Sequence, residues 1–426
     1  MIPDRAPTGT PPAPYAAPIA ACRASGSRTL VPVLSLGEMP LANALLSEAQ
    51  LGSPEPRYPL ELVFAPESAL LQLTLSVAPE QLFSEYVYFS SFSNGMLESA
   101  NAIVDRLVRE RRLGPDALAL EIASNDGYLL QYYKQRGVPV LGIEPAANVA
   151  RVAVADRGIP TRTEFFGLDA ARRLVAEGAR ADVVHANNVL AHVPDLNGFV
   201  EGLRLVLRYD GVAVIEVPYV RDMLERCEFD TIYHEHLSYF SLTSLQWLFA
   251  RHALAIIDVE QIPLHGGSLR VFVAPARAGR APASRVASLL DEEARWGVSD
   301  PRAYVDFARR VERLRTDFRA LVGRLKAEGK RIAAYGAAAK GSVLLNYCGV
   351  GAETLDYVVD RSTVKQGRYM PGVHLRIEAP ERLLADRPDY VVVLAWNFAD
   401  EIIEQQAEYR RGGGRFLIPV PTPRIV

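Results

Sequence analysis

Four consecutive residues of this chain, Tyr233-His234-Glu235-His236, place a phenol, two imidazoles and a carboxylate next to one another. A third imidazole, on His192, follows the pair Asn187-Asn188 at the end of a predicted strand. Histidine titrates near neutral pH, so a histidine beside a carboxylate can act as a general base. The alternative is that the run caps a helix and satisfies loop backbone. The density of such groups, together with His192, favours a catalytic site.

A second set of polar residues occupies a short turn earlier in the chain. The apolar run 118–122 predicts a buried strand, and the turn Ala123-Ser124-Asn125-Asp126-Gly127 follows it. Apolar residues then recur with helical spacing, and a second predicted strand, 138–143, ends in Glu144. In such a unit the small turn lets backbone N–H groups approach a nucleotide, and the acid accepts hydrogen bonds from its ribose hydroxyls.

The composition of this turn indicates which nucleotide it binds. It lacks the G-x-G-x-x-G pattern that holds a dinucleotide pyrophosphate, which argues against a nicotinamide dehydrogenase. S-adenosylmethionine fits better, because its ligand end is an amino acid and a sulfonium without phosphate. We therefore expect S-adenosylmethionine as the cofactor, bound by residues 123–127, Glu144, Asn187 and Asn188. A purely structural strand–helix–strand crossover is the alternative.

The elements around these residues predict an α/β fold with two Rossmann-like units. Alternating strands and helices between residues 96 and 280 predict a mainly parallel, doubly wound sheet, whose strand ends should bring both sets of residues together. A second strand, turn and helix begin at residue 331, and Lys340 stands near the helix start, a natural anion site. The expected domains are a disordered leader (1–21), a small irregular N-terminal lobe (22–95), the central doubly wound domain (96–280), a helical linker (281–328) and a C-terminal Rossmann-like domain (329–426).

Within the predicted linker, apolar residues alternate three and four positions apart over three heptads. These residues are Tyr304, Phe307, Val311, Leu314, Phe318, Leu321 and Leu325. The spacing predicts a long amphipathic helix, whose apolar stripe could form a dimer seam or pack on its own domain. A monomer and a homodimer are both compatible with this pattern.

The bulk composition is typical of a soluble globular enzyme. The 426 residues carry a formal net charge of −3, so neither nucleic acid nor an anionic membrane is an expected partner. The chain has no apolar run of about 18 residues, so no membrane span is expected. Its Pro- and Ala-rich N-terminus lacks the features of a signal peptide. Three scattered cysteines cannot form a disulfide framework, and the cytoplasm is the expected compartment.

In its longer motifs the chain resembles the S-adenosylmethionine-dependent sugar C-methyltransferases that act on nucleotide-linked 4-keto-deoxysugars. The matching segments run in order over nearly the whole chain past residue 30. They read MPLANA, LFSEYVYFSSFS, EIASNDGYLL, GIEPAANVA, NNVLAHVPDL, YHEHLSYFS, HGGSLRVF, YGAAAKG, YVVDRS and LAWNFADEI. The resemblance implies a zinc-binding N-terminal lobe, a central methyltransferase domain and a C-terminal Rossmann-like domain that helps to hold the nucleotide sugar.

The resemblance also implies roles for individual residues. His236 would be the base that removes the proton from C3 of the sugar, next to the ketone, and the resulting enolate would be methylated. Tyr233, Glu235 and His192 would line the sugar. Residues expected to contact the substrate are Tyr86, Tyr88, Ser90, Ser91 and Lys340. An arginine such as Arg270 or Arg361 is a further candidate for the pyrophosphate.

The chain departs from the family in its N-terminal lobe. The family binds zinc there with two C-x-x-C pairs, which place four thiolates around a tetrahedral ion. Here the pairs read Cys22-Arg23-Ala24-Ser25 and Ala65-Pro66-Glu67-Ser68, so a single thiolate is left. We therefore predict no structural zinc and no other metal. The lobe should either be looser than in relatives or fold on the apolar packing of Leu60, Leu62, Leu70, Leu71 and Leu73.

Three functional hypotheses follow. The first is C-methylation of a nucleotide-linked keto sugar for a natural product. The second, motivated by the lost zinc ligands, is an enzyme of the same scaffold that methylates a non-sugar ketone or enol in natural-product biosynthesis. The third is a non-catalytic binding module, which would show a broken SNDG turn or YHEH run, and both are intact. The expected partner is thus a small molecule.

Overall fold

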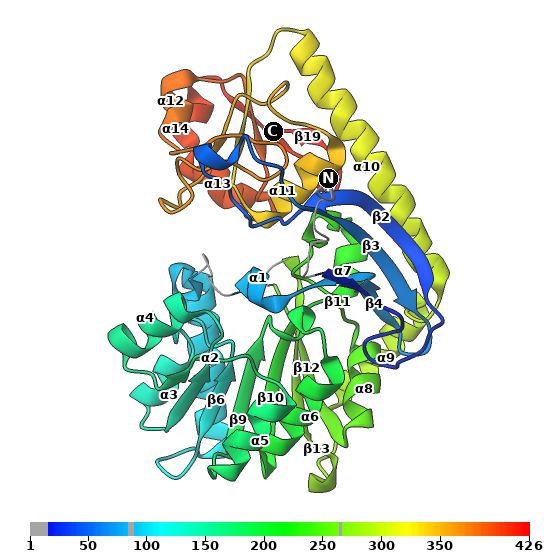
Figure 1. The fold of residues 1–426 in the computed structure, drawn as a ribbon, viewed down its shortest axis with the longest axis vertical. Coiled ribbons are helices and arrows are strands. Elements are labelled where there is room, and N and C mark those ends of the chain that lie inside the picture. Colours follow the sequence, from blue (N-terminus) through cyan, green and yellow to red (C-terminus); the bar gives the residue numbers. More distant parts are fainter. Residues whose placement is uncertain (1–15, 84–88, 264–265) are drawn as a thin grey trace, which may run out of the picture.

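The computed structural model describes residues 16–83, 89–263 and 266–426 (Figure 1). The central domain occupies one end of the molecule and the C-terminal domain the other, with the N-terminal lobe between them (Figure 1). The long helix α10 (Pro301–Ala327) runs along one side and connects these parts. Every domain therefore borders the region in which the predicted site lies.

The central domain is built on a seven-stranded sheet in the order β12-β13-β10-β9-β6-β7-β8. Its strands are β6 (Ala119–Ile122), β7 (Val140–Ile143), β8 (Thr161–Arg162), β9 (Ala181–Asn187), β10 (Leu207–Pro218), β12 (Leu254–Ile262) and β13 (Ser268–Pro275). Neighbouring strands from β10 to β8 are parallel, whereas β13 is antiparallel to both β10 and β12. The prediction of a mainly parallel, doubly wound sheet is confirmed.

Helices cover both faces of this sheet. They are α2 (Asn94–Arg111), α3 (Leu130–Gln135), α4 (Ala147–Arg157), α5 (Leu168–Ala176), α6 (Leu196–Val206), α8 (Leu242–Arg251) and α9 (Ser284–Trp296). Helix α7 (Val220–Glu225) instead packs with the N-terminal lobe and the long helix α10. Along β10, Val212 and Val214 pack into the apolar cluster that contains α2 and α3. Ala213 and Ile215 pack into the cluster that contains α6 and α8. This alternation buries both faces of the strand, as a parallel sheet between two helical layers requires.

The N-terminal lobe contains an antiparallel sheet in the order β11-β4-β3-β2 and is more regular than the sequence predicted. Its strands are β2 (Val31–Pro40), β3 (Arg57–Ala65), β4 (Leu70–Leu73) and β11 (Ser238–Tyr239). Bulges interrupt the pairing of β2 with β3, so the regular alternation that would reveal a strand is absent from the sequence. Strand β11 directly follows the run 233–236, so the lobe and this run are joined through one sheet.

The expectation of a disordered leader was wrong for its last residues. Ala16–Pro18 forms strand β1, which is antiparallel to β5 (Leu75–Val77), although residues 1–21 were expected to be disordered. The partner strand lies some sixty positions along the chain, so a local composition rule could not detect the pairing. Residues 1–15 lie outside the described ranges. The short helices of this part are η1 (Glu48–Gln50), α1 (Pro79–Phe83) and η2 (Ser90–Phe92).

Helix α10 begins after Asp300, whose side chain accepts a hydrogen bond from the Arg302 N–H at 2.9 Å, with Pro301 as its first residue. Its seven predicted stripe residues all pack into one apolar cluster with the N-terminal lobe and the C-terminal domain. The Tyr304 ring stacks on the Phe64 ring of β3, with centroids 4.1 Å apart. Of the two alternatives for the stripe, packing on its own chain is the one observed.

The C-terminal domain contains a six-stranded sheet in the order β16-β15-β14-β17-β18-β19, which is parallel except for β19. Its strands are β14 (Ile332–Tyr335), β15 (Val358–Val359), β16 (Ile377–Glu378), β17 (Tyr390–Val393), β18 (Arg415–Ile418) and β19 (Arg424–Ile425). Its helices are α11 (Ala339–Cys348), α12 (Arg382–Asp386), α13 (Ala399–Gln405) and α14 (Ala407–Arg411). The predicted second Rossmann-like unit is confirmed. Among the described residues, no helix combines the length and the apolar character that a membrane crossing needs.

Candidate active site

The turn after β6 is tightly curled, as its small residues predicted. Ala123, Asn125 and Gly127 have φ angles of 52°, 49° and 76°, which lie in the left-handed region. The Asn125 N–H donates to Glu144 Oε2 at 2.8 Å, and the Ala146 N–H donates to Oε1 at 2.8 Å. Both oxygens of Glu144 are therefore held in place at the end of β7. Burial of this carboxyl raises its pKa.

The segment before α2 lies against the same turn. The Ser90 N–H donates to Asn125 Oδ1 at 3.0 Å, and the Ser91 hydroxyl donates to the carboxylate of Asp126. Arg157 of α4 holds this carboxylate from another side, with Nη2 at 3.3 Å from Oδ2. Ser90 and Ser91, which the resemblance assigned to the substrate, thus contact the turn predicted for the cofactor. The other two predicted members of this segment, at positions 86 and 88 (Tyr86 and Tyr88), lie outside the described residues.

Asn187 is the last residue of β9 and Asn188 follows it; because β9 is paired with β6, both lie at the same sheet edge as the turn. Asn188 adopts a left-handed φ of 55°, and its N–H donates to the Glu216 carbonyl at 2.8 Å. Within the described part of the chain, the buried Asn187 Oδ1 and Ser124 Oγ have no hydrogen-bond partner. Buried polar atoms without partners are expected where a polar ligand binds, so this edge fits S-adenosylmethionine.

The predicted base, His236, has a defined orientation. Its Nδ1 lies 2.8 Å from the Thr231 carbonyl, which can only accept, so Nδ1 carries the proton. Nε2 is then the basic nitrogen, and the Tyr233 hydroxyl donates to it at 3.0 Å. The two rings lie 4.1 Å apart between centroids and are tilted by 35° relative to each other. Thr231 was not recognised in the sequence, because the contact runs through its backbone.

His192 and Glu235 complete the cluster. The His192 ring lies 4.9 Å from the His236 ring, and its Nδ1 donates to the Glu235 carbonyl at 2.6 Å. Desolvation lowers the pKa of His192 to about 4, so its ring is neutral near pH 7. Burial raises the pKa of Glu235 to about 7, partly offset by a hydrogen bond from Asn43 Nδ2 to its Oε1 at 2.7 Å. Asn43 was missed as a site residue, although it belongs to the MPLANA motif.

The side chain of His234 is directed away from this cluster. It is buried, and its Nε2 lies 3.3 Å from the carbonyl oxygens of both Tyr58 and Pro59 in β3. Burial lowers its pKa. The alternative that the run satisfies loop backbone therefore describes His234. The side chains of Tyr233, His236 and His192 come together, whereas Glu235 joins them through its backbone carbonyl and directs its carboxyl to Asn43.

Lys340 lies in the first turn of α11, at the junction of the central and C-terminal domains. Its Nζ is 4.6 Å from the centroid of the Trp396 ring, and Trp396 Nε1 donates to Asp230 Oδ2 at 2.6 Å. Burial raises the pKa of Asp230 to about 6, and the charge of Lys340 opposes this shift. The lysine thus provides a countercharge for a buried carboxyl at this junction.

The turn that precedes α11 repeats the arrangement seen after β6. The Ala337 N–H donates to Asp360 Oδ2 at 2.8 Å, and the Ser362 N–H donates to Oδ1 at 2.8 Å. Asp360 follows β15 as Glu144 follows β7, and each strand neighbours the strand that leads into its turn. Both Rossmann-like units therefore hold an acid against a backbone N–H at their strand ends.

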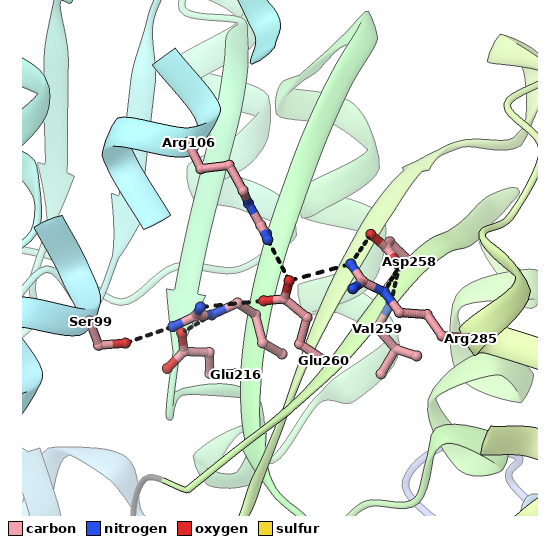
Figure 2. A network of polar contacts seen from close by, with 8 residues as sticks. Ser99, Arg106, Glu216, Asp258, Val259, Glu260 and Arg285 are labelled. Carbon is pink, nitrogen blue, oxygen red and sulfur yellow. Dashed lines mark hydrogen bonds and ion pairs between the residues drawn. The ribbon is translucent and has the colours of Figure 1, made fainter. Parts of the chain in front are cut away.

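The hypothesis that Arg270 binds a pyrophosphate was wrong. Its buried guanidinium donates from Nε to Glu216 Oε1 at 2.6 Å and from Nη2 to Ser99 Oγ at 2.8 Å, and its Nη1 lies 3.5 Å from Glu260 Oε2 (Figure 2). These partners already surround the cation inside the sheet. The other candidate, Arg361, is exposed, with Nη1 at 3.8 Å from Glu401 Oε1.

Three family models match consecutive parts of the chain. They are described as a zinc binding domain (residues 22–83), a methyltransferase domain (residues 96–259) and a C-methyltransferase C-terminal domain (residues 263–421). The C-methyltransferase NovU of Streptomyces niveus is 38% identical over 409 residues, which cover 96% of this chain and 97% of that protein.

Two solved structures each match less than half of this chain. Magnesium protoporphyrin IX methyltransferase of Synechocystis PCC 6803, with S-adenosylmethionine bound, is 14% identical, with a TM-score of 0.33 over 42% of this chain and 80% of that one. An S-adenosylmethionine-dependent methyltransferase of Anabaena variabilis is 15% identical, with a TM-score of 0.33 over 41% of this chain and 84% of that one.

Proposed function

Because the chain belongs to the family of S-adenosylmethionine-dependent C-methyltransferases, we propose that it methylates C3 of a nucleotide-linked 4-keto-deoxysugar. When bound, S-adenosylmethionine supplies an electrophilic methyl group on its sulfonium. The acceptor carbon lies next to a ketone and becomes nucleophilic only after it loses a proton. The observation that carries the proposal is the basic Nε2 of His236, held between Tyr233 and Thr231.

Proton removal is assigned to His236. Its Nε2 takes the C3 proton, and the electron pair of the C–H bond moves to the ketone oxygen, which gives an enolate. The imidazolium formed keeps its Nδ1–H on the Thr231 carbonyl, which stabilises the positive charge. Once Nε2 holds the proton, the hydroxyl of Tyr233 can turn to donate to the enolate oxygen. The neutral ring of His192, whose one N–H donates to the Glu235 carbonyl, lies beside the His236 ring. The carboxyl of Glu235 is held by Asn43 of the N-terminal lobe, and its backbone carbonyl accepts the N–H of His192.

Binding of S-adenosylmethionine is assigned to the strand ends of the central sheet. Residues 123–127 form the tight turn over which the cofactor would lie, and the carboxylate of Glu144, which this turn holds, is the acceptor for ribose hydroxyls. Asn187, Asn188 and the segment with Ser90 and Ser91 border this turn.

The nucleotide of the substrate is assigned to the C-terminal domain. Asp360 is held at the end of β15 as an acceptor for a second ribose, which supports a nucleotide-linked acceptor. Lys340 places a positive charge at the start of α11, where an anionic diphosphate is favoured. A non-sugar ketone or enol is the alternative acceptor, and the altered N-terminal lobe, which borders Glu235, favours it.

Titration calorimetry with S-adenosylhomocysteine and, separately, with thymidine diphosphate tests this proposal. Binding of both supports a nucleotide-linked acceptor. Binding of the first alone would move the assignment to a non-sugar acceptor. Binding of neither ligand by folded protein would contradict the proposed enzyme.

Two variants separate the roles of base and cofactor site. His236→Ala should lower the methylation rate at least about a hundredfold, while the affinity for S-adenosylhomocysteine stays nearly unchanged. Glu144→Ala should instead weaken that affinity. His374→Ala, whose exposed ring pairs with Glu55, is the matched control and should change neither quantity. Full activity of the His236 variant would exclude it as the base.

A further inference from the structure

The N-terminal lobe matches the model of a zinc-binding domain, but its residues do not fit a zinc ion. The positions of the two C-x-x-C pairs are occupied by Cys22, Ser25, Ala65 and Ser68. One thiol cannot form a tetrahedral site, because serine hydroxyls are poor zinc ligands and alanine has none to offer. Throughout the described ranges, no three His, Cys, Asp or Glu side chains are grouped as a metal site.

The four positions nevertheless remain together. Cys22 Sγ lies 3.3 Å from Ser68 Oγ and 3.5 Å from the Ser25 N–H nitrogen. Ala65 is fully buried and belongs to the same apolar cluster as Cys22. The four positions thus remain close together without forming an ion-binding set, and the segment around Cys22 is tied to the lobe by the pairing of β1 with β5 and by a side chain of its own.

Arg23 makes this connection. Its buried guanidinium donates to the carbonyl oxygens of Leu73 and Leu75 at 2.6 and 3.2 Å and to Ser76 Oγ at 2.8 Å. Its backbone N–H donates to Gln72 Oε1 at 3.0 Å. Within the described part of the chain, no carboxylate forms an ion pair with this guanidinium, so its charge is compensated by carbonyl dipoles.

The same guanidinium reaches the catalytic segment. Arg23 Nη1 lies 3.4 Å from the carbonyl oxygen of Leu237, the residue that follows His236. This carbonyl also accepts the Leu73 N–H at 3.0 Å, and the Leu237 N–H donates to the Ala191 carbonyl at 2.7 Å, next to His192. His236 directly precedes Leu237, and His192 directly follows Ala191. Arg23 therefore helps to hold the backbone next to both of these histidines.

We propose that Arg23 cross-links the N-terminal lobe, whose residues do not fit a zinc ion, and is a positioning residue for His236. A guanidinium suits this task because its planar fork of five N–H donors can bind several carbonyl oxygens at fixed angles. An ammonium group has the same charge but lacks the fork. The part that concerns His236 rests on the proposed function.

Arg23→Lys tests the proposal, with Arg28→Lys as matched control, because Arg28 is exposed in the same segment. The Arg23 variant should lose at least about tenfold in kcat, while its affinity for S-adenosylhomocysteine stays unchanged, since only the catalytic segment is displaced. Hydrogen exchange at the Leu73 and Leu237 amides should become faster in the Arg23 variant alone. Unchanged kcat and unchanged exchange would overturn the proposal.

Rescue by zinc provides a second test. Ser25→Cys, Ala65→Cys and Ser68→Cys would complete four thiols with Cys22, and added zinc should then restore kcat to the Arg23→Lys protein. Zinc binding without restored activity would overturn the positioning role. One equivalent of zinc in the natural protein, with loss of activity on chelation, would overturn the inference that the residues of this lobe do not fit zinc. Hydrogen exchange is measured without substrate. Its result therefore tests the cross-link by Arg23 even if the proposed function is wrong.

Discussion

At the residue scale, the site depends on which of several adjacent groups face the same space. His234 and His236 are two positions apart, yet one is bonded to β3 and the other to Tyr233 and Thr231. Glu235 between them is buried and held by Asn43 from the N-terminal lobe. A single run therefore connects the lobe to the reacting groups.

As the pH rises, the Glu235→Gln variant should lose less unfolding free energy than the natural protein. Burial raises the pKa of Glu235 from 4.5 to about 7, so between these values the folded chain binds more protons than the unfolded chain. The free energy of unfolding then falls as the pH rises through this window, by at most about 3 kcal/mol for this group. The amide cannot titrate, and the fall should be smaller in the variant.

Urea unfolding at about pH 5 and about pH 8 measures this difference. Glu228 and Asp230, with pKa values raised to about 7 and about 6, contribute the same sign in both proteins, so part of the slope should remain. The exposed Glu110→Gln is the control and should follow the natural protein. Equal slopes for all three proteins would show that Glu235 does not titrate in this range.

At the scale of elements, a polar ladder crosses the edge of the central sheet. Glu216 of β10, Arg270 of β13 and Glu260 of β12 stand directly opposite one another in register. Arg106 of α2 and Arg285 of α9 pair with Glu260 from either side (Figure 2). The ladder fixes the antiparallel strands to the parallel ones, close to the strand end that carries Asn187 and Asn188.

Arg270→Ala should lower the free energy of unfolding by about 3–5 kcal/mol, because it leaves Glu216 as a buried carboxylate without its partner. Arg285→Ala should cost less than about 1 kcal/mol, because that arginine is half exposed and its ion pairs are weakened by water. Chemical denaturation of both variants measures the difference. Similar losses for the two arginines would contradict the buried pair as the stronger contact.

At the scale of the whole molecule, α10 and the N-terminal lobe unite the two Rossmann-like units. The helix packs on β2, α7 and α11, so it contacts the lobe and both flanking domains. Strand β11, from the middle of the chain, pairs with β4 in the sheet of the lobe. The residues of the proposed site thus come from more than one domain.

Phe307→Ala should cost about 3–5 kcal/mol of unfolding free energy, because its ring is fully buried within the chain's own core. Val305→Ala, at an exposed position of the same helix, is the control and should cost little. The loss should be the same at about 1 μM and about 100 μM protein, since no second copy is needed to bury the ring. A loss that depends on concentration would instead indicate a dimer seam.

The amino-acid sequence by itself determined the features that depend on neighbours along the chain. Apolar runs and their period identified β6, β7 and α10, and small residues with Glu144 identified the turn for a nucleotide. The density of titratable groups identified the run 233–236. These properties follow from backbone geometry within a few residues, which is why local patterns were sufficient.

Only the tertiary structure decided how distant groups are combined. It directed His234 to the lobe, enclosed Arg270 between two glutamates, brought Asn43 to Glu235 and placed Arg23 against Leu237. These contacts join residues separated by 54 to 214 positions. Their partners are selected by packing, burial and the need to satisfy every buried polar group, and these conditions arise only when the whole chain is folded.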